Sequence, residues 1–163
     1  IYASSPVTDG QKVWIYYMGG NGQHTNFRES SLGRAYWEAD KFACWTEKNE
    51  GMESILTTTT LTLGGNYIEV LADEADAEKD WELMASVHPV WTENAYEGLG
   101  MEDAVTEKSG RWIRISWKGK KLPDKSGCIR FQFKNLKIWA VRGELEYKGH
   151  RLWEGADMEN EGM

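Results

Sequence analysis

Short runs of alternating apolar and polar residues, separated by turn-forming residues, recur along most of the chain. The segment 36–65, YWEADKFACWTEKNEGMESILTTTTLTLGG, holds two such extended runs, a charged turn, four consecutive threonines and a double glycine. Alternation with a period of two is typical of strands that bury one face. Since these runs are short and helical periodicity is scarce, the sequence predicts an all-β protein.

The turn signals divide the chain into about eight to ten short strands. We expect Gly64-Gly65 to turn the chain, Lys134-Asn135 to close a hairpin, and residues 92–110 to form a long connection. So many short strands predict an antiparallel two-sheet β-sandwich of the jelly-roll or concanavalin-like kind. The expected strands cover residues 13–18, 42–45, 54–63, 66–71, 81–87, 111–117, 128–133, 136–141, 144–147 and 150–153.

A chain of 163 residues is long enough for one domain with a buried core. We therefore expect a single sandwich over residues 1–163, with a frayed acidic tail at 154–163. The first residues lack an initiator Met and the pattern of a signal peptide, which suggests a mature chain or an excised piece. No apolar run is long enough to cross a bilayer.

The net charge of −7 argues against nucleic acid or an anionic membrane surface as the main partner. It fits a neutral ligand, or none. The two cysteines, Cys44 and Cys128, both lie in strand-like runs and form no CxxC motif. We expect buried thiols, and a single bridge between early and late strands is the alternative.

Five segments together resemble a known protein class. They are YYMGGNGQHT (16–25), LGRAYWEADKFACW (32–45), ILTTTTLTLGGNYIEVLAD (55–73), RISWKG (114–119) and GCIRFQFKNLKIWAVR (127–142). Their order is similar to the C-terminal β-sandwich of five-bladed-propeller glycoside hydrolases, in the invertase/levanase-like and related arabinanase-like groups. The resemblance implies that residues 1–30 contain a remnant of a last propeller strand plus a linker.

The resemblance does not carry catalysis to this chain. In such enzymes the catalytic acids belong to propeller blades that have no counterpart among these residues. This chain also departs from the family pattern at Asp40-Lys41-Phe42, where Asp-Gly-Phe is usual. Pairs of carboxylates are easy to nominate among 26 acidic residues, but no pair stands out from an acidic surface.

Nine tryptophans are the main functional signal, because a flat indole can stack on the apolar face of a sugar. Trp14, Trp112 and Trp139 lie in strongly apolar runs and are expected in the core. The tryptophans beside polar loops are the candidate platforms, together with an aromatic and an amide neighbour. These carbohydrate-binding candidates are Trp45, Trp91, Tyr96, Trp117, Trp153 and Asn94.

The acidic stretch 72–80 is the candidate metal site, since Ca²⁺ prefers several oxygen ligands on one loop. Asp73, Asp76 and Asp80 would supply a structural calcium site, whereas a charged loop that protects a sheet edge is the plainer alternative. The histidines have no zinc-ligand spacing. No other cofactor is expected.

These features predict a non-catalytic, carbohydrate-binding or lectin-like module, extracellular or secreted. A structural domain that packs against a propeller or a neighbouring protein domain is the second hypothesis, and an exposed apolar patch around Tyr16-Tyr17-Met18 would favour it. A small glycoside hydrolase is the third. The sequence does not indicate the oligomeric state.

Overall fold

A computed structural model describes residues 2–23, 25, 29–49 and 51–147. The expected strand at 150–153 and the expected tail at 154–163 lie outside the described residues. The elements are β1 (Tyr2–Ala3), β2 (Val7–Thr8), β3 (Lys12–Gly20), β4 (Ser30–Glu38), β5 (Trp45–Thr46), β6 (Ser54–Thr57), β7 (Leu61–Glu74), β8 (Glu82–His88), η1 (Met101–Asp103), β9 (Ala104–Ser109), β10 (Trp112–Trp117), β11 (Lys125–Lys134) and β12 (Leu136–Tyr147).

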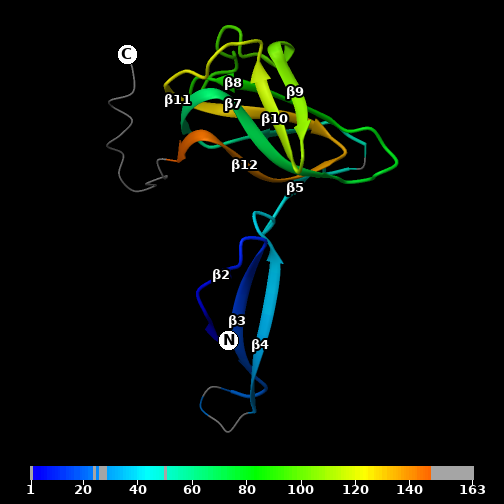
Figure 1. The fold of residues 1–163 in the computed structure, drawn as a ribbon, viewed down its shortest axis with the longest axis vertical. Coiled ribbons are helices and arrows are strands. Elements are labelled where there is room, and N and C mark those ends of the chain that lie inside the picture. Colours follow the sequence, from blue (N-terminus) through cyan, green and yellow to red (C-terminus); the bar gives the residue numbers. More distant parts are fainter. Residues whose placement is uncertain (1, 24, 26–28, 50, 148–163) are drawn as a thin grey trace.

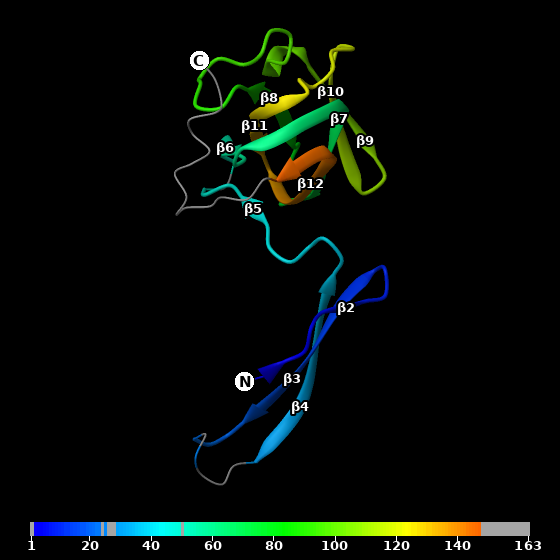
Figure 2. The same cartoon turned by 90° about the vertical axis from the view of Figure 1, so that its left-hand side faces the viewer.

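The protein is all-β and its strands pair antiparallel, as predicted. Strands β1 to β4 form a small sheet in which β3 is central. Figures 1 and 2 show this sheet as a long, narrow ribbon that extends away from the remaining strands. The two packed layers are built from strands within residues 45–147.

Strands β5 to β12 form the larger part of the protein, here called the body, which has two layers that share β11. The larger layer has the order β5-β12-β7-β10-β9, and the three-stranded layer has the order β6-β11-β8. The first residues of β11, Lys125 to Gly127, pair with β7, and the rest of β11 pairs with β6 and β8. This change of partner joins the two layers at one corner and confirms the antiparallel β-sandwich.

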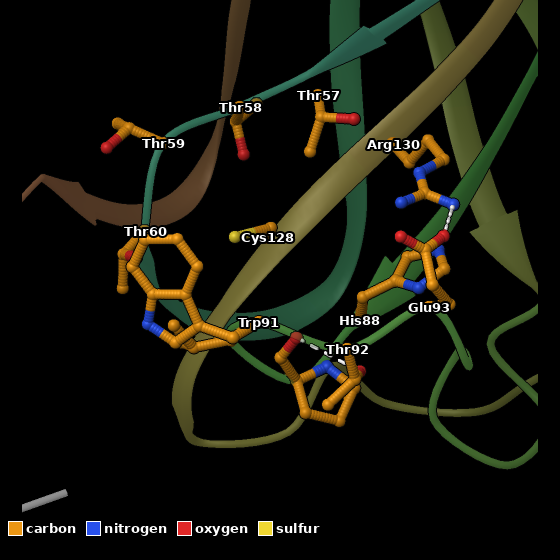
Figure 3. A pocket seen from close by; sticks show the side chains of 12 residues that line it. Thr57, Thr58, Thr59, Thr60, His88, Trp91, Thr92, Glu93, Cys128 and Arg130 are labelled. Atoms are coloured by element: carbon orange, nitrogen blue, oxygen red, sulfur yellow. Dashed lines mark hydrogen bonds and ion pairs between the residues drawn. The ribbon is translucent and has the colours of Figure 1, made fainter.

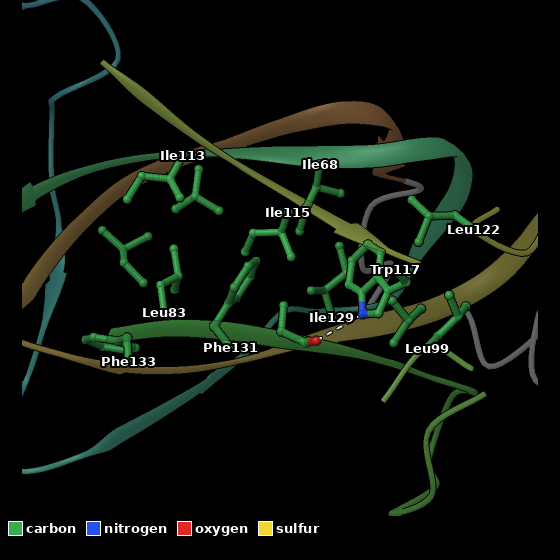
Figure 4. Packing of buried hydrophobic residues seen from close by; sticks show 14 of the residues in the cluster. Ile68, Leu83, Leu99, Ile113, Ile115, Trp117, Leu122, Ile129, Phe131 and Phe133 are labelled. Carbon is green, nitrogen blue, oxygen red and sulfur yellow. Dashed lines mark hydrogen bonds between the residues drawn. The ribbon is translucent and has the colours of Figure 1, made fainter. Parts of the chain in front are cut away.

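Apolar residues of alternating positions fill the space between the layers. Ile113, Ile115 and Trp117 of β10 point inward, and so do Ile129, Phe131 and Phe133 of β11, as Figure 4 shows. The Trp117 indole donates a hydrogen bond to the Ala85 carbonyl of the opposite layer at 3.1 Å. Burying these large side chains is the main stabilising contribution to such a fold.

Three local predictions are wrong, each because pairing with strands distant in sequence decides where a strand begins or ends. Gly64-Gly65 does not turn the chain but lies inside β7, at an irregularity opposite Glu144, which a Cβ at Gly65 would crowd. Residues 58–60 interrupt the expected strand 54–63, because β6 and β7 belong to different layers. Residues 92–110 include β9, which pairs with β10.

The predicted hairpin at Lys134-Asn135 is also wrong. β11 and β12 pair with other strands and not with each other, so the chain crosses from one layer to the other at Asn135. Asn135 has a left-handed φ of 53°, which asparagine tolerates better than most residues. Its side-chain oxygen accepts a bond from the Asp76 amide, and its nitrogen donates to the Asp76 and Lys79 carbonyls, each at 2.8 Å.

Lys41 links the connection after the small sheet to the body. Its ammonium lies 2.8 Å from Asp73 and 3.0 Å from Glu38. Burial would raise the pKa of Asp73, but hydrogen bonds from Lys41 and Trp139 outweigh that effect and lower it. The only helix among the described residues is the three-residue η1, and no helix there is long and apolar enough to span a membrane.

Candidate functional site

A cavity of about 340 Å³ opens on the outer face of the three-stranded layer. Its floor comes from β8 and β11, where His88 and Cys128 are direct cross-strand partners. One wall is the run Thr57–Thr60, here called the threonine wall, and the other is the segment that follows β8. The lining residues are Thr57, Thr58, Thr59, Thr60, His88, Pro89, Val90, Trp91, Thr92, Glu93, Cys128 and Arg130, most of which are labelled in Figure 3.

The threonine wall forms where the chain crosses between the layers. The Thr58 amide donates to the Ile129 carbonyl at 2.9 Å, and its hydroxyl accepts from the Ile129 amide at 3.0 Å. These two bonds anchor the crossing on β11. The hydroxyls of Thr57, Thr59 and Thr60 make no hydrogen bond within the described part of the chain, so they are available to a ligand.

Trp91 stands at the cavity rim and is 86% exposed. Its φ of 64° is left-handed, which is unusual for a bulky residue and strained. The turn is held by the Thr92 hydroxyl, which is within bonding distance of the Pro89 and Asn94 carbonyls at 3.2 and 3.1 Å. The structure therefore holds a large aromatic ring in solvent on a turn that is braced by its own hydrogen bonds.

A charged pair closes the end of the cavity away from Trp91. The Arg130 guanidinium lies 3.1 Å from the Glu93 carboxylate. The pairing register puts Arg130 beside Thr57 of β6 and Ser86 of β8, so its Cα is fixed by a strand on each side. Figure 3 shows Trp91 and Arg130 on opposite sides of Cys128.

His88 is buried in the floor, and its Nε2 lies 2.7 Å from the Ser86 hydroxyl. Burial, and then the nearby positive charge of Arg130, lower the pKa of His88, while the backbone of Glu93 and Asn94 and the negative charge of Glu93 act in the opposite direction without offsetting them. A histidine with a lowered pKa is neutral at neutral pH. The floor therefore presents an uncharged imidazole and a thiol, with Arg130 as the cation.

The candidates predicted from the sequence fall in different places. Trp91 lines the cavity, and Asn94 is exposed on the same turn. Tyr96 is half-buried beyond it, with its hydroxyl donating to the Ser126 carbonyl at 3.2 Å. Trp45 is 65% exposed on β5, away from the cavity lining. Trp153 lies outside the described residues.

Trp117 is a correction, because its ring is 0% exposed in the core and cannot stack on a ligand. Conversely, Trp14, Trp112 and Trp139 were expected in the core, but they are only partly buried. Trp112 lies under the Arg142 guanidinium, and the Trp139 indole donates to the Asp73 carboxylate. The predicted division between core and platform tryptophans is thus wrong for these four residues.

The proposed calcium ligands do not converge. Asp73 is engaged with Lys41 and Trp139, and Asp76 pairs with Lys79 at 3.1 Å. Across the residues that the structure describes, no three His, Cys, Asp or Glu side chains are grouped to hold a metal ion. Cys44 and Cys128 are both free and half-buried, so the bridged alternative is also wrong.

Sequence reasoning missed most of the cavity, namely the threonine wall, Glu93, Cys128, His88 and Arg130. The clean alternation of 128–133 does place Cys128 and Arg130 on one face, opposite Ile129 and Phe131. Nothing in the sequence predicts that this face meets His88 or the threonines, because that depends on strand register.

Searches against protein-family models, curated proteins and solved structures find no match to this chain. The resemblance to the sandwich of propeller glycoside hydrolases therefore stays a prediction.

Proposed function

We propose that this protein is a non-catalytic carbohydrate-binding module whose site is the Trp91 cavity. The observation that carries the proposal is an indole exposed in solvent beside a cavity lined by hydroxyl and charged groups. Leaving a tryptophan so exposed forfeits burial of a large apolar surface, which is reasonable where a ligand covers it. An extracellular location fits the proposal, since polysaccharides are abundant there.

The chemistry of the cavity suits a sugar. A pyranose or furanose ring has an apolar face that can lie on the Trp91 indole, and its hydroxyls need both donors and acceptors. The hydroxyls of Thr57, Thr59 and Thr60 serve as either, and Arg130 donates. The affinity of one such shallow site is expected to be weak, and several copies would raise it by avidity.

The number of carboxylates at the cavity favours a binding role over hydrolysis. Glycosidases place two carboxylates across the scissile bond, about 5–10 Å apart. Among the described residues that line the cavity, Glu93 is the single carboxylate, and it is paired with Arg130. A binding role needs no second acid.

The test is a glycan array, followed by titration of the best ligand with tryptophan fluorescence and calorimetry. Trp91→Ala should weaken binding at least about tenfold, as expected for an anchoring aromatic residue. Trp45→Ala is the matched control, because Trp45 is also exposed but does not line the cavity. Equal affinity of the wild type and Trp91→Ala would show that the site is elsewhere, and silence across the array would reject the proposal.

A second candidate function, a structural domain that packs against a partner, is favoured by the small sheet. On one face of β3 and β4 lie Val13, Ile15 and Tyr17, with Ala35 and Trp37 as their neighbours across the strands. Tyr17 on this face, and Tyr16 and Met18 on the opposite face, are each about 40% exposed, and no other described strand pairs with or covers β3 and β4 beyond β1 and β2. Such exposed apolar surface commonly marks an interaction site.

Hydrogen exchange separates this second role from the first. If the small sheet docks on a five-bladed propeller of the resembled class, the β3 and β4 amides should exchange slowly when that propeller is added and faster in the chain alone. Exchange that is unchanged by the propeller, in a protein that binds glycans, would leave only the carbohydrate-binding role.

A further inference from the structure

We infer that the Trp91 cavity selects saccharides that carry a carboxylate, that is, uronic-acid residues, and that Arg130 recognises that carboxylate. The inference rests on the proposed function, and it differs from the neutral ligand that the net charge alone suggests.

Arg130 is a partly buried cation whose position is fixed by the surrounding strands. Its side chain is only 25% exposed, and its backbone is held between β6 and β8. Its partner Glu93, in contrast, is 89% exposed on the turn that carries Trp91. An ion pair with so exposed a partner contributes little to stability, so Glu93 can be exchanged for another carboxylate at small cost.

The ion pair with Glu93 also leaves N–H groups of the Arg130 guanidinium available to a ligand. Only Nη1 of Arg130 bonds Glu93, at 3.1 Å, and within the described residues the guanidinium makes no other hydrogen bond. A guanidinium presents five N–H groups in a planar fork that matches a carboxylate with two parallel bonds. A ligand carboxylate can therefore make a bidentate contact that Glu93 does not make.

The surrounding charges favour an anion at this point. Arg130 is the only Lys or Arg among the described residues that line the cavity, and His88 beside it is neutral at neutral pH. When Glu93 swings out, the positive charge is uncompensated until a ligand carboxylate replaces it. The net charge of −7 is spread over the whole surface and is screened beyond about 8 Å at physiological ionic strength.

The positions of the groups define the ligand. Trp91 and Arg130 stand on opposite sides of Cys128 in Figure 3, so an oligosaccharide with one ring stacked on Trp91 would carry a further residue over the floor toward Arg130. The threonine wall then meets ring hydroxyls. The class that combines an apolar ring face, hydroxyls and a carboxylate is a uronate-containing oligosaccharide.

The test uses the full chain and paired ligands. Oligosaccharides of glucuronate, galacturonate and mannuronate are each titrated beside their carboxyl-reduced, neutral counterparts, and sulfated oligosaccharides form a third set. The wild type should bind at least one uronate about tenfold or more tightly than its neutral counterpart, since charge-assisted bidentate bonds are strong. Arg130→Gln should remove that preference, and Glu93→Gln should increase uronate affinity, because it removes the competing carboxylate.

Arg34→Gln is the matched control, because Arg34 lies on β4 of the small sheet. It should leave the preference unchanged. A folded Arg130→Gln, checked by circular dichroism, that keeps the uronate preference overturns the inference. Equal binding of uronates and their neutral counterparts also overturns it while the proposed function stands, and so does stronger binding of sulfated ligands. No binding of any saccharide rejects both.

Discussion

Replacing Trp117 by phenylalanine tests the claim that this indole supports the core rather than a ligand. The ring is fully buried between the layers, and its nitrogen donates to the Ala85 carbonyl. Phenyl is smaller than indole by roughly 40 Å³, and at ~24 cal/mol per Å³ of cavity this costs about 1 kcal/mol. Loss of the hydrogen bond costs about 1 kcal/mol more. We therefore expect Trp117→Phe to lower the free energy of unfolding by about 2 kcal/mol.

Urea unfolding followed by far-ultraviolet circular dichroism measures this loss. With a slope of about 2 kcal/mol per molar urea, the midpoint should fall by about 1 M, at an unchanged slope. Trp91→Phe is the matched control, since its ring is almost entirely in solvent and its replacement should change stability by less than about 0.5 kcal/mol. If the two substitutions shift the midpoint equally, the assignment of Trp117 to the core is refuted.

Three further substitutions test the architecture. Glu69→Gln breaks a bridge to Arg114 and Arg142, whose hydrogen bonds hold the pKa of Glu69 below its usual 4.5. The wild type should be more stable by about 1 kcal/mol at pH 7, since both arginines are partly exposed, and urea midpoints should converge as the pH falls below 4.5. Gly127→Ala places a Cβ 2.7 Å from the His88 carbonyl and should cost about 2 kcal/mol, or about 5 °C of melting temperature, whereas Gly19→Ala, which meets no atom within 4 Å, should not. Asn135→Ala should cost about 2–3 kcal/mol and Asn135→Gly less, because glycine keeps the left-handed φ; equal losses would assign the whole effect to the side-chain bonds.

The fold class could be predicted because strand periodicity is local. The inward set of β11, Ile129, Phe131 and Phe133, is read directly from alternation. The same rule, applied strictly to β10, puts Trp117 with Ile113 and Ile115 on the inner face, and Trp112 on the outer one. The prediction for Trp117 is wrong because it follows the polar neighbour Lys118, whereas the alternation of β10 decides which face of the sheet the indole is on.

Turns were less predictable than strands, because glycine and asparagine permit several structures. Gly64-Gly65 would suit a tight turn, but β7 continues through it, since β12 offers a partner on the far side. Lys134-Asn135 would suit a hairpin, but Asn135 bonds to the 76–79 segment and directs β12 to the other layer. In both cases a partner distant in sequence decides the outcome.

The candidate site depended on the same distant partners. Trp91 was predicted by its polar neighbours, but Arg130, His88 and the threonine wall meet only through the registers of β6, β8 and β11. A slip of β11 by one residue would turn Arg130 and Cys128 inward and expose Ile129 and Phe131, so the buried face that stabilises the core also holds the site in place. The net charge is likewise a poor guide to the local electrostatics of this cavity, because it sums side chains over the whole surface, whereas strand pairing sets the cation Arg130 at one fixed place in the lining.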